Sequence, residues 1–387
     1  MERRNACDVA ILGGGLAGGL IALALRRARP ELRALVIEGG QSLGGNHIWS
    51  FFASDVSAEG MALLAPLIGH RWEGYDVRFP AHARTLGTGY HSIRSGDFDS
   101  VLRAALPADA LVFGAQVREA SPVSVTLDGG VEIAAGGVID CRGGSDMALL
   151  DCGWQKFVGL EIELPDPHGL ERPIVMDATV EQIDGYRFVY SLPLGERRIF
   201  VEDTYYSDGP ALDVAAIEAR VLAYAEARGW RGGAIIHRET GVLPVTLGGD
   251  FEGYWRSGGP TAKAGTRAGL FHPTTGYSLP DAVETALLIA GLDDLSGPAL
   301  ERALHDHARR KWEERGFYRM LDRMMFRGAG TGERHRILER FYTLDAGLIE
   351  RFYAGRSSLA DKARILAGKP PIPIGRAIGA LWESRTR

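Results

Sequence analysis

Cysteine is scarce in this 387-residue sequence: Cys7, Cys141 and Cys152 are too few and too widely spaced for a disulfide framework or a zinc site. No run of 18 or more apolar residues occurs, so we expect no segment that spans a bilayer. The motifs G-x-S-x-G, H-E-x-x-H and C-x-x-C and the P-loop lysine are absent, which weighs against a hydrolase, a zinc enzyme and an NTPase. These absences predict a protein of a reducing compartment, the cytoplasm, without a metal site.

Positive charge is not in excess overall. The formal net charge is −5, which argues against nucleic acid as the main partner. However, residues 301–387 carry 19 Lys and Arg against 11 Asp and Glu, whereas the other 300 residues carry 25 against 38. This basic C-terminal region predicts an anionic partner, and we expect a membrane surface, although an ordinary helical cap with a basic outside explains the pattern equally well. Aromatic residues lie among its arginines, namely Trp312, Phe317, Phe326, Phe341 and Phe352.

The N-terminal segment has the pattern of a β-turn-α-β unit. An apolar, β-branched run at residues 8–12 ends at three glycines, residues 16–28 form a helical pattern stopped by Pro30, and residues 33–38 resemble a second strand. The unit has the span of a dinucleotide-binding fold. We therefore predict a Rossmann-type region over residues 1–150, with inserted segments.

The remaining chain divides into three further regions. Residues 151–260 alternate aromatic and polar positions between prolines, which predicts an antiparallel substrate domain with one helix at about 212–228. Residues 261–297 are expected to return to the first region, and residues 298–387 have a helical pattern and form a candidate membrane-docking face. The predicted fold class is α/β with an added antiparallel sheet domain (α+β) and a basic helical C-terminal region.

A glycine fingerprint opens the first helix. Gly13, Gly15 and Gly18 satisfy G-x-G-x-x-G, and Glu38 ends the following strand. Glycines there permit a tight turn and a close approach to a pyrophosphate, which the helix N-terminus attracts. A carboxylate at position 38 accepts hydrogen bonds from an adenosine ribose and repels a 2′-phosphate. The fingerprint favours FAD or NAD over a purely structural turn and disfavours NADP as the tightly bound nucleotide.

Two other glycine segments leave a functional and a structural interpretation open. Gly44 and Gly45 follow the second strand, where they allow a close approach to a cofactor or form a plain surface turn. The segment AGLFHPTTGYSLP at 268–280, which contains His272 and Gly276, directs a helix start toward a cofactor or simply caps that helix. His272 by itself is more often a structural histidine than a catalytic one.

An acidic pair lies on a strand among aromatic residues. Within FVEDT at 200–204, Glu202 and Asp203 must face opposite sides of the strand. If Glu202 faces a cavity with Tyr186 and Tyr190, burial raises the pKa of its carboxyl and makes it a candidate general acid. From the residues alone, a solvent-facing pair is the favoured interpretation.

Longer motifs resemble those of the bacterial lycopene β-cyclases, from about residue 8 to 375. The resemblance is carried by GGGLAGGLIALAL, GGNHIWSF, HRWEGYDVRFP, MDATV, GYRFVYSLP, FVEDT, GLFHPTTGYSLP, RFYAGR and KARILAGKPPIP. It implies a flavoprotein of the p-hydroxybenzoate-hydroxylase-like type, which binds FAD non-covalently and converts ψ-ends of lycopene into β-rings, through γ-carotene to β-carotene. One departure concerns the last FAD loop, where many such flavoproteins carry Gly-Asp and this chain has Ala268-Gly269.

The resemblance assigns roles to particular residues. Glu202 matches the family's acid that starts cyclisation, a reaction without net redox that uses reduced FAD, with NADPH as the ultimate reductant. The substrates are lycopene and other ψ-end carotenoids, and the protein is expected at the inner face of the membrane. FAD is expected at Gly13, Gly15, Gly18, Glu38, Gly44, Gly45 and Gly276. The substrate end is expected among Trp49, Phe51, Tyr186, Tyr190, His272 and Tyr277.

Other functions fit the same sequence. A FAD-dependent monooxygenase or a polyprenyl reductase of the same fold would use FAD for true redox chemistry. A non-catalytic flavin-binding membrane protein would bind FAD and leave lycopene unchanged. The sequence leaves open whether one or both ends are cyclised, which group takes the proton from C6, and the oligomeric state.

Overall fold

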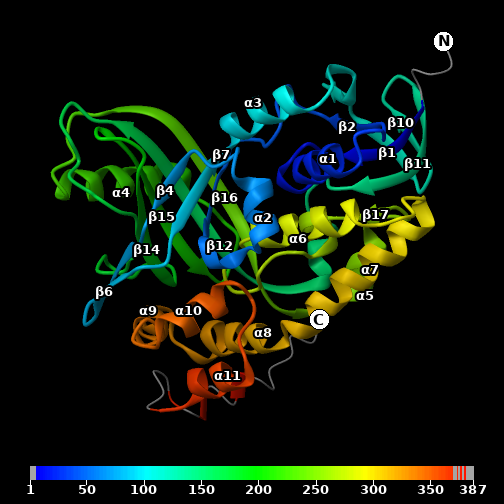
Figure 1. Ribbon diagram of the computed structural model, residues 1–387. Helices are drawn as coiled ribbons and strands as arrows, with labels where there is room; N and C mark the ends of the chain where they lie inside the picture. Colours follow the sequence, from blue (N-terminus) through cyan, green and yellow to red (C-terminus); the bar gives the residue numbers. More distant parts are fainter. Residues whose placement is uncertain (1–5, 369–372, 374, 377–378, 381–387) are drawn as a thin grey trace.

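The computed structural model describes residues 6–368, 373, 375–376 and 379–380. Figure 1 shows an α/β layer, a large twisted sheet beside it, and a group of C-terminal helices below both. Within the described ranges, no helix is long and apolar enough to cross a bilayer, and no cluster of three or more His, Cys, Asp or Glu is arranged to hold a metal ion.

The first sheet contains a parallel core. β8, β2, β1 and β11 are parallel neighbours in that order, β17 pairs with β11, and β10 and β9 extend the sheet in antiparallel fashion. Parallel neighbours bring the ends of β1 and β2, and the loops that follow them, to one edge. The strands are β1 (Ala6–Leu12), β2 (Ala34–Glu38), β8 (Leu111–Phe113), β9 (Val117–Ser121), β10 (Ser124–Leu127), β11 (Glu132–Asp140) and β17 (Ala262–Lys263).

Helices cover this sheet and share its main core. Helix α1 is buried except at its last turn and packs closely on α6 and α3. A Cβ on Gly19 of α1 would lie 2.4 Å from the Phe98 ring of α3. The predicted helix at 16–28 is confirmed, because its glycine start and its proline stop both mark real ends. The helices are α1 (Leu16–Ala28), α2 (Ala58–Leu64), α3 (Ser95–Ala105), α5 (Phe251–Ser257), α6 (Leu279–Ala290) and α7 (Gly297–Glu314).

The second sheet has seven strands in the order β16-β12-β15-β14-β13-β5-β6. All neighbours are antiparallel except β13 and β5, and helix α4 (Val214–Ala227) packs on β12 and β15. Two of its strands come from within residues 1–150, so this sheet is not formed by one chain segment. The strands are β5 (Tyr75–Arg78), β6 (Ala83–Leu86), β12 (Leu150–Glu163), β13 (Ile174–Asp177), β14 (Tyr186–Pro193), β15 (Arg198–Ser207) and β16 (Ala234–Gly249).

A small antiparallel sheet lies between the two larger ones. Its order is β3-β7-β4, formed by β3 (Ile48–Phe52), β4 (His70–Trp72) and β7 (Tyr90–Arg94). Five single-turn 3-10 helices occur in the described ranges: η2 (Ala53–Asp55), η3 (Ala108–Ala110), η4 (Met147–Leu149), η5 (Gly265–Ala268) and η7 (Thr331–Glu333).

The C-terminal helices pack against the large sheet. They are α8 (Gly316–Arg323), the π-helical turn η6 (Met324–Gly328), α9 (His335–Phe341), α10 (Ala346–Tyr353) and α11 (Leu359–Leu366). Phe326, Phe341 and Phe352 are buried in a core shared with the sheet, so they do not form the aromatic docking face expected from the sequence. Helical periodicity identifies an apolar face and does not say whether protein or lipid covers it. Beyond residue 368, most of the predicted helical C-terminal region (298–387) lies outside the described residues.

Candidate active site

The loop between β1 and α1 is built from tightly packed backbone. Gly13 has a φ of +92°, which L side chains rarely adopt, and a Cβ on Gly18 would lie 2.0 Å from the carbonyl oxygen of Gly13. Apart from Gly15 and its two chain neighbours, no atom lies within 4 Å of a Cβ built on Gly15, where α1 begins without a side-chain cap. Uncapped N–H groups of α1 therefore face open space, an arrangement that binds phosphate.

The other expected nucleotide-binding residues surround this loop. The Glu38 carboxylate accepts hydrogen bonds from the N–H groups of Gly14 and Gly40, each at 2.7 Å. The N–H of Gly44 donates to the carbonyl oxygen of Gly14 at 2.9 Å, and Gly44 and Gly45 both have positive φ. A free helix start, an open glycine position and a carboxylate at the end of β2 together fit an adenine dinucleotide.

This nucleotide cradle shares a wall with a cavity of about 270 Å³. Gly265 packs on the first turn of α1, because its Cβ would lie 2.9 Å from the Cβ of Ala17. The next residue, Thr266, lines the cavity, as does Gly276, which has a φ of +68°. A dinucleotide held at the start of α1 therefore has room to extend its reactive end into this cavity.

One wall of the cavity is a face of the large sheet. Directly paired residues share a face, and three such rows cross β14, β15, β12 and β16: Tyr190–Glu202–Gly159–Glu239, Phe188–Thr204–Phe157–Gly241 and Tyr186–Tyr206–Gln155–Leu243. Two aromatic rings occupy the space above glycines, because a Cβ on Gly159 would lie 2.2 Å from Phe200 and one on Gly241 would lie 2.3 Å from Phe157. The wall is therefore mostly apolar, and its polar groups are the two carboxyl groups, Thr204, Gln155 and the tyrosine hydroxyls.

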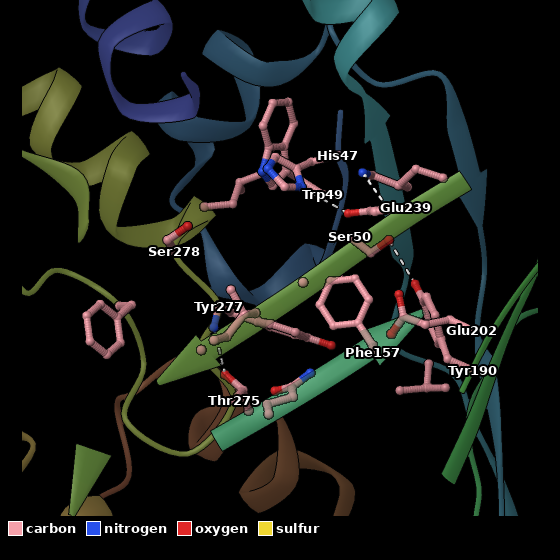
Figure 2. A pocket seen from close by; sticks show the side chains of 18 of the residues that line it. His47, Trp49, Ser50, Phe157, Tyr190, Glu202, Glu239, Thr275, Tyr277 and Ser278 are labelled. Atoms are coloured by element: carbon pink, nitrogen blue, oxygen red, sulfur yellow. Dashed lines mark hydrogen bonds and ion pairs between the residues drawn. The ribbon is translucent and has the colours of Figure 1, made fainter. Parts of the chain in front are cut away.

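Glu202 projects from β15 into the cavity. Figure 2 shows it next to Tyr190 at one end of the cavity, whereas Tyr277 and Thr275 lie toward the other. The hydroxyl of Thr204 donates to Oε1 of Glu202 at 2.6 Å. Burial, and secondarily the charge of Glu239, raise the pKa of Glu202 to about 8. The carboxyl group is therefore mostly protonated at neutral pH, as a general acid requires.

Glu239 is the second carboxyl group of this wall, and the sequence motifs do not single it out. Its Oε1 lies 3.1 Å from Nδ1 of His47, and its Oε2 accepts the N–H of Ile48 at 3.1 Å. Both contacts come from the segment that leads into β3, on the opposite side of the cavity. Only the strand register places residue 239 in the same row as Glu202.

Hydroxyl groups connect the sheet wall with β3. The hydroxyl of Tyr190 donates to Oγ of Ser50 at 2.8 Å and lies 2.9 Å from the hydroxyl of Tyr90. Oγ of Ser50 lies 2.7 Å from Oγ of Ser92. This network fixes the Tyr190 ring beside Glu202, which rigidifies the end of the cavity where the acid lies.

The cavity wall differs from the expected one at three positions. Trp49, Tyr190 and Tyr277 line the cavity together with Glu202, whereas Phe51, Tyr186 and His272 do not. The Phe51 ring packs in the α/β core and lies 5.3 Å from the ring of His91. Tyr186 is the first residue of β14, two positions before the cavity-lining Phe188, and its hydroxyl donates to Sδ of Met176 at 3.3 Å.

His272 is a structural residue. The N–H of Thr274 donates to its Nδ1 at 3.2 Å, so Nε2 carries the proton and donates to the carbonyl oxygen of Phe352 at 3.1 Å. Burial and the charge of Arg315 lower the pKa of His272 to about 3. The ring stays neutral and connects the loop before α6 to α10, which supplies Tyr353 to the cavity wall.

Comparison with known proteins agrees with this geometry. The sequence model of the family described as lycopene cyclase protein matches residues 8–378. The chain belongs to the lycopene cyclase family. It is 48% identical over 386 residues to a lycopene beta-cyclase of Paracoccus sp. (strain N81106 / MBIC 01143), covering 97% of both chains. It is 46% identical over 370 residues to a lycopene beta-cyclase of Pseudescherichia vulneris, covering 96% of both.

Solved structures with little sequence similarity share the fold of this lycopene cyclase family member. A geranylgeranyl bacteriochlorophyll reductase-like protein of Thermoplasma acidophilum gives a TM-score of 0.64 at 15% identity, over 95% of this chain and 97% of the other. A probable FAD-dependent monooxygenase of Pseudomonas aeruginosa, pqsL, gives 0.61 at 18% identity, over 87% and 100%. The family, the enzyme class and the fold class predicted from the sequence are thus confirmed.

Proposed function

We propose that this chain cyclises the ψ-ends of lycopene to β-rings, through γ-carotene to β-carotene, by acid-initiated carbocation chemistry that begins at Glu202. The observation that carries this proposal is a mostly protonated carboxyl group on the apolar wall of a cavity that adjoins a nucleotide cradle. Lycopene and β-carotene are isomers, so the reaction moves protons and no net electrons. Other carotenoids with a ψ-end present the same reacting atoms and are expected substrates.

The first step is proton transfer from Glu202 to C2 of the ψ-end. An alkene is a very weak base, so the acid must be protonated and must lie close to C2. A glutamic acid with an ordinary pKa near 4.3 is protonated in only about one molecule in 500 at neutral pH, whereas a pKa of about 8 reverses that ratio to about ten to one. The hydrogen bonds of Thr204 and Tyr190 hold the acid and its neighbouring ring in one arrangement.

The second step closes the ring, as the C5=C6 bond attacks the cation at C1 and leaves positive charge at C5. Aromatic faces stabilise that charge by about 0.5–2 kcal/mol each through cation–π attraction. Phe157, Tyr190 and Trp49 line the cavity on both sides and are placed to do so. Most of the remaining lining is apolar, which limits the water that can capture the cation.

The cradle fits FAD. The start of α1 would hold the pyrophosphate, Glu38 would hold the ribose of the adenosine, and Gly44, Gly45 and Gly276 would border the rest of the cofactor. When bound in its reduced, anionic form, FAD supplies negative charge beside the carbocation. NADPH is the proposed reductant. It would reduce FAD before the first turnover and would not be consumed with each ring formed.

We further propose that the protein docks on the inner, cytoplasmic face of the membrane through α11. Leu359 and Leu366 of this helix are 84% and 50% exposed, and Lys362 and Arg364 lie between them in sequence. Exposed apolar side chains with neighbouring basic ones favour a helix lying in an anionic interface. Lycopene, a long hydrocarbon, is dissolved in that bilayer.

Expression in cells that accumulate lycopene tests the activity. Pigment chromatography is expected to show γ-carotene and β-carotene with the wild-type chain and lycopene alone with Glu202→Gln, because an amide delivers no proton. Glu226→Gln, an exposed change on α4, is the matched control and is expected to behave as wild type. Unchanged lycopene with the wild-type chain, or oxygen uptake in step with product, would refute the proposal.

A further inference from the structure

Glu202 and Glu239 face each other across one glycine. Gly159 of β12 pairs with Glu202 of β15 on one side and with Glu239 of β16 on the other. The two carboxyl groups therefore rise from the same face, two strand spacings or about 10 Å apart at the backbone. Both glutamates line the cavity. Gly159 between them has no side chain, and the ring of Phe200 fills the space where one would lie.

The surroundings of Glu239 differ from those of Glu202. The Glu239 side chain is 5% exposed and accepts two hydrogen bonds from N–H groups, those of Ile48 and His47, whereas Glu202 accepts one from a hydroxyl. With Glu239 ionised, Nδ1 of His47 carries the proton that it donates. Two N–H donors stabilise a carboxylate, so the pair is arranged as one acid and one base.

His47 connects Glu239 to solvent. Its side chain is 48% exposed and borders both the cavity and an open hollow of about 610 Å³ on the other side of the segment before β3. When Glu239 is protonated, the His47 ring in its Nε2–H tautomer can accept that proton at Nδ1 and release the Nε2 proton to solvent. The other charged or titratable groups of this neighbourhood are His70, Arg94, Asp97, Asp99, Arg198 and His237, which line the hollow, and Glu161, which Arg94 and Arg198 bind.

We propose that Glu239 is a second catalytic residue, the base that removes the proton from C6 and thereby fixes the double bond of the β-ring. The proposal rests on the proposed function and extends it to the last step. Glu202 gives its proton to C2 and becomes a carboxylate, and the C1–C6 bond forms. The C6–H bond then breaks, its electron pair forms C5=C6, and its proton goes to Glu239. Glu239 releases the proton through His47, Glu202 takes one from solvent, and no electrons are exchanged.

Other groups of the cavity are less suited to this role. Burial raises the pKa of Tyr190 and Tyr277 above its usual value, so neither is a phenolate at neutral pH. Glu202, having given its proton to C2, would lie beside C2. Glu239 lies two strands away on the same face of the sheet, where it can reach a different carbon of the substrate end. The wall residues between them are aromatic rings and glycines that hold no proton.

The test uses the identity of the ring as well as the rate. The cation at C5 also borders C4 and a methyl group, and proton loss there gives a ring with its double bond at C4–C5 or outside the ring. Wild-type, Glu239→Gln, Glu239→Asp and Arg238→Gln chains are given chemically reduced FAD and lycopene, either unlabelled or deuterated at C6 and C6′, under argon. Arg238 is the control because it lies on the opposite face of β16, where it binds Glu218.

With Glu239→Gln we expect β-ring formation to fall about 100-fold or more. We also expect either misplaced double bonds or a C6 deuterium isotope effect that the wild type lacks. Glu239→Asp should keep β-rings at an intermediate rate, and Arg238→Gln should match the wild type. Glu239→Gln making β-rings within threefold of the wild-type rate overturns the base assignment, as does a slow variant with β-rings alone and no isotope effect. A wild-type chain that makes no rings overturns the proposed function itself.

Discussion

Glu202 and Asp203 are consecutive residues of β15 whose carboxyl groups lie on opposite faces of the sheet. Asp203 is completely buried and bound by Arg187 at 2.8 Å and by the hydroxyl of Tyr205 at 2.7 Å. Glu202 has a single hydroxyl donor and opens onto the cavity. The strand thus separates a structural ion pair from a reactive acid, and only the second can deliver a proton to a substrate.

The first prediction concerns the pH dependence of the reaction. Because the pKa of Glu202 is raised to about 8, its carboxyl group is mostly protonated below that pH and mostly ionised above it. The cyclisation rate at low lycopene concentration should be nearly constant from pH 6 to 7.5 and then fall about tenfold per pH unit above 8. The measurement is the initial rate of β-ring formation with pre-reduced FAD. A rate that is unchanged between pH 7 and 9.5 would contradict Glu202 as the acid.

The same group makes a prediction about stability. The folded-state pKa of Glu202 lies above its unfolded value of about 4.5, so the folded chain holds a proton that the unfolded chain loses between pH 4.5 and 8. Stability from this group is therefore lost as pH rises through that window. Glutamine does not titrate, so Glu202→Gln should gain stability over the wild type from pH 5 to pH 9, by up to about 4 kcal/mol. Urea unfolding at both pH values measures the difference, and a constant difference would show that the carboxyl is not buried in this way.

Two glycines of the fingerprint should respond differently to valine. Gly15 has open space around its Cβ position, so Gly15→Val should fold normally and lose FAD, because the side chain enters the path of the pyrophosphate. Gly18→Val should fail to fold, because its Cβ would lie 2.0 Å from the Gly13 carbonyl oxygen. Thermal unfolding and the flavin absorption spectrum after incubation with FAD separate the two effects. A Gly15→Val chain that binds FAD as tightly as the wild type would place the cofactor elsewhere.

The membrane surface of α11 can be tested with vesicles. Wild-type protein should bind anionic vesicles more tightly than neutral ones, and salt should weaken that binding, because exposed charges are screened over about 10 Å at 0.1 M salt. Leu359→Glu with Leu366→Glu should reduce binding at least tenfold, since it removes apolar contact and adds negative charge. Leu222→Glu, an exposed leucine on α4, is the control. Equal binding of the double variant and the wild type would remove α11 from the docking surface.

Some of this structure could be predicted from sequence because the signals are local. The ends of α1 are marked by Gly15 and Pro30, and the β-branched and aromatic residues around Glu202 predict a strand. The position of Glu239 could not be predicted in this way, because it depends on how β16 pairs with β12 and β12 with β15. A one-residue slip of either register would place that carboxylate on the other face. Phe352 likewise lies in the core because Tyr318 and Phe341, from two other helices, pack on its ring.

The last prediction follows the protons with deuterium. In D2O with chemically reduced FAD, protonation at C2 adds a deuteron from Glu202 and loss from C6 removes a protium, so each ring should gain one mass unit. β-Carotene made from unlabelled lycopene should therefore be about two units heavy, and a monocyclic product about one. This labelling requires Glu202 to exchange with solvent between turnovers, through the cavity that its side chain lines. Reduced flavin should stay reduced through many turnovers under argon, because the reaction has no net redox. Stoichiometric flavin oxidation would contradict the mechanism, whereas unlabelled product with unoxidised flavin would mean that the C6 proton returns to Glu202 within the cavity.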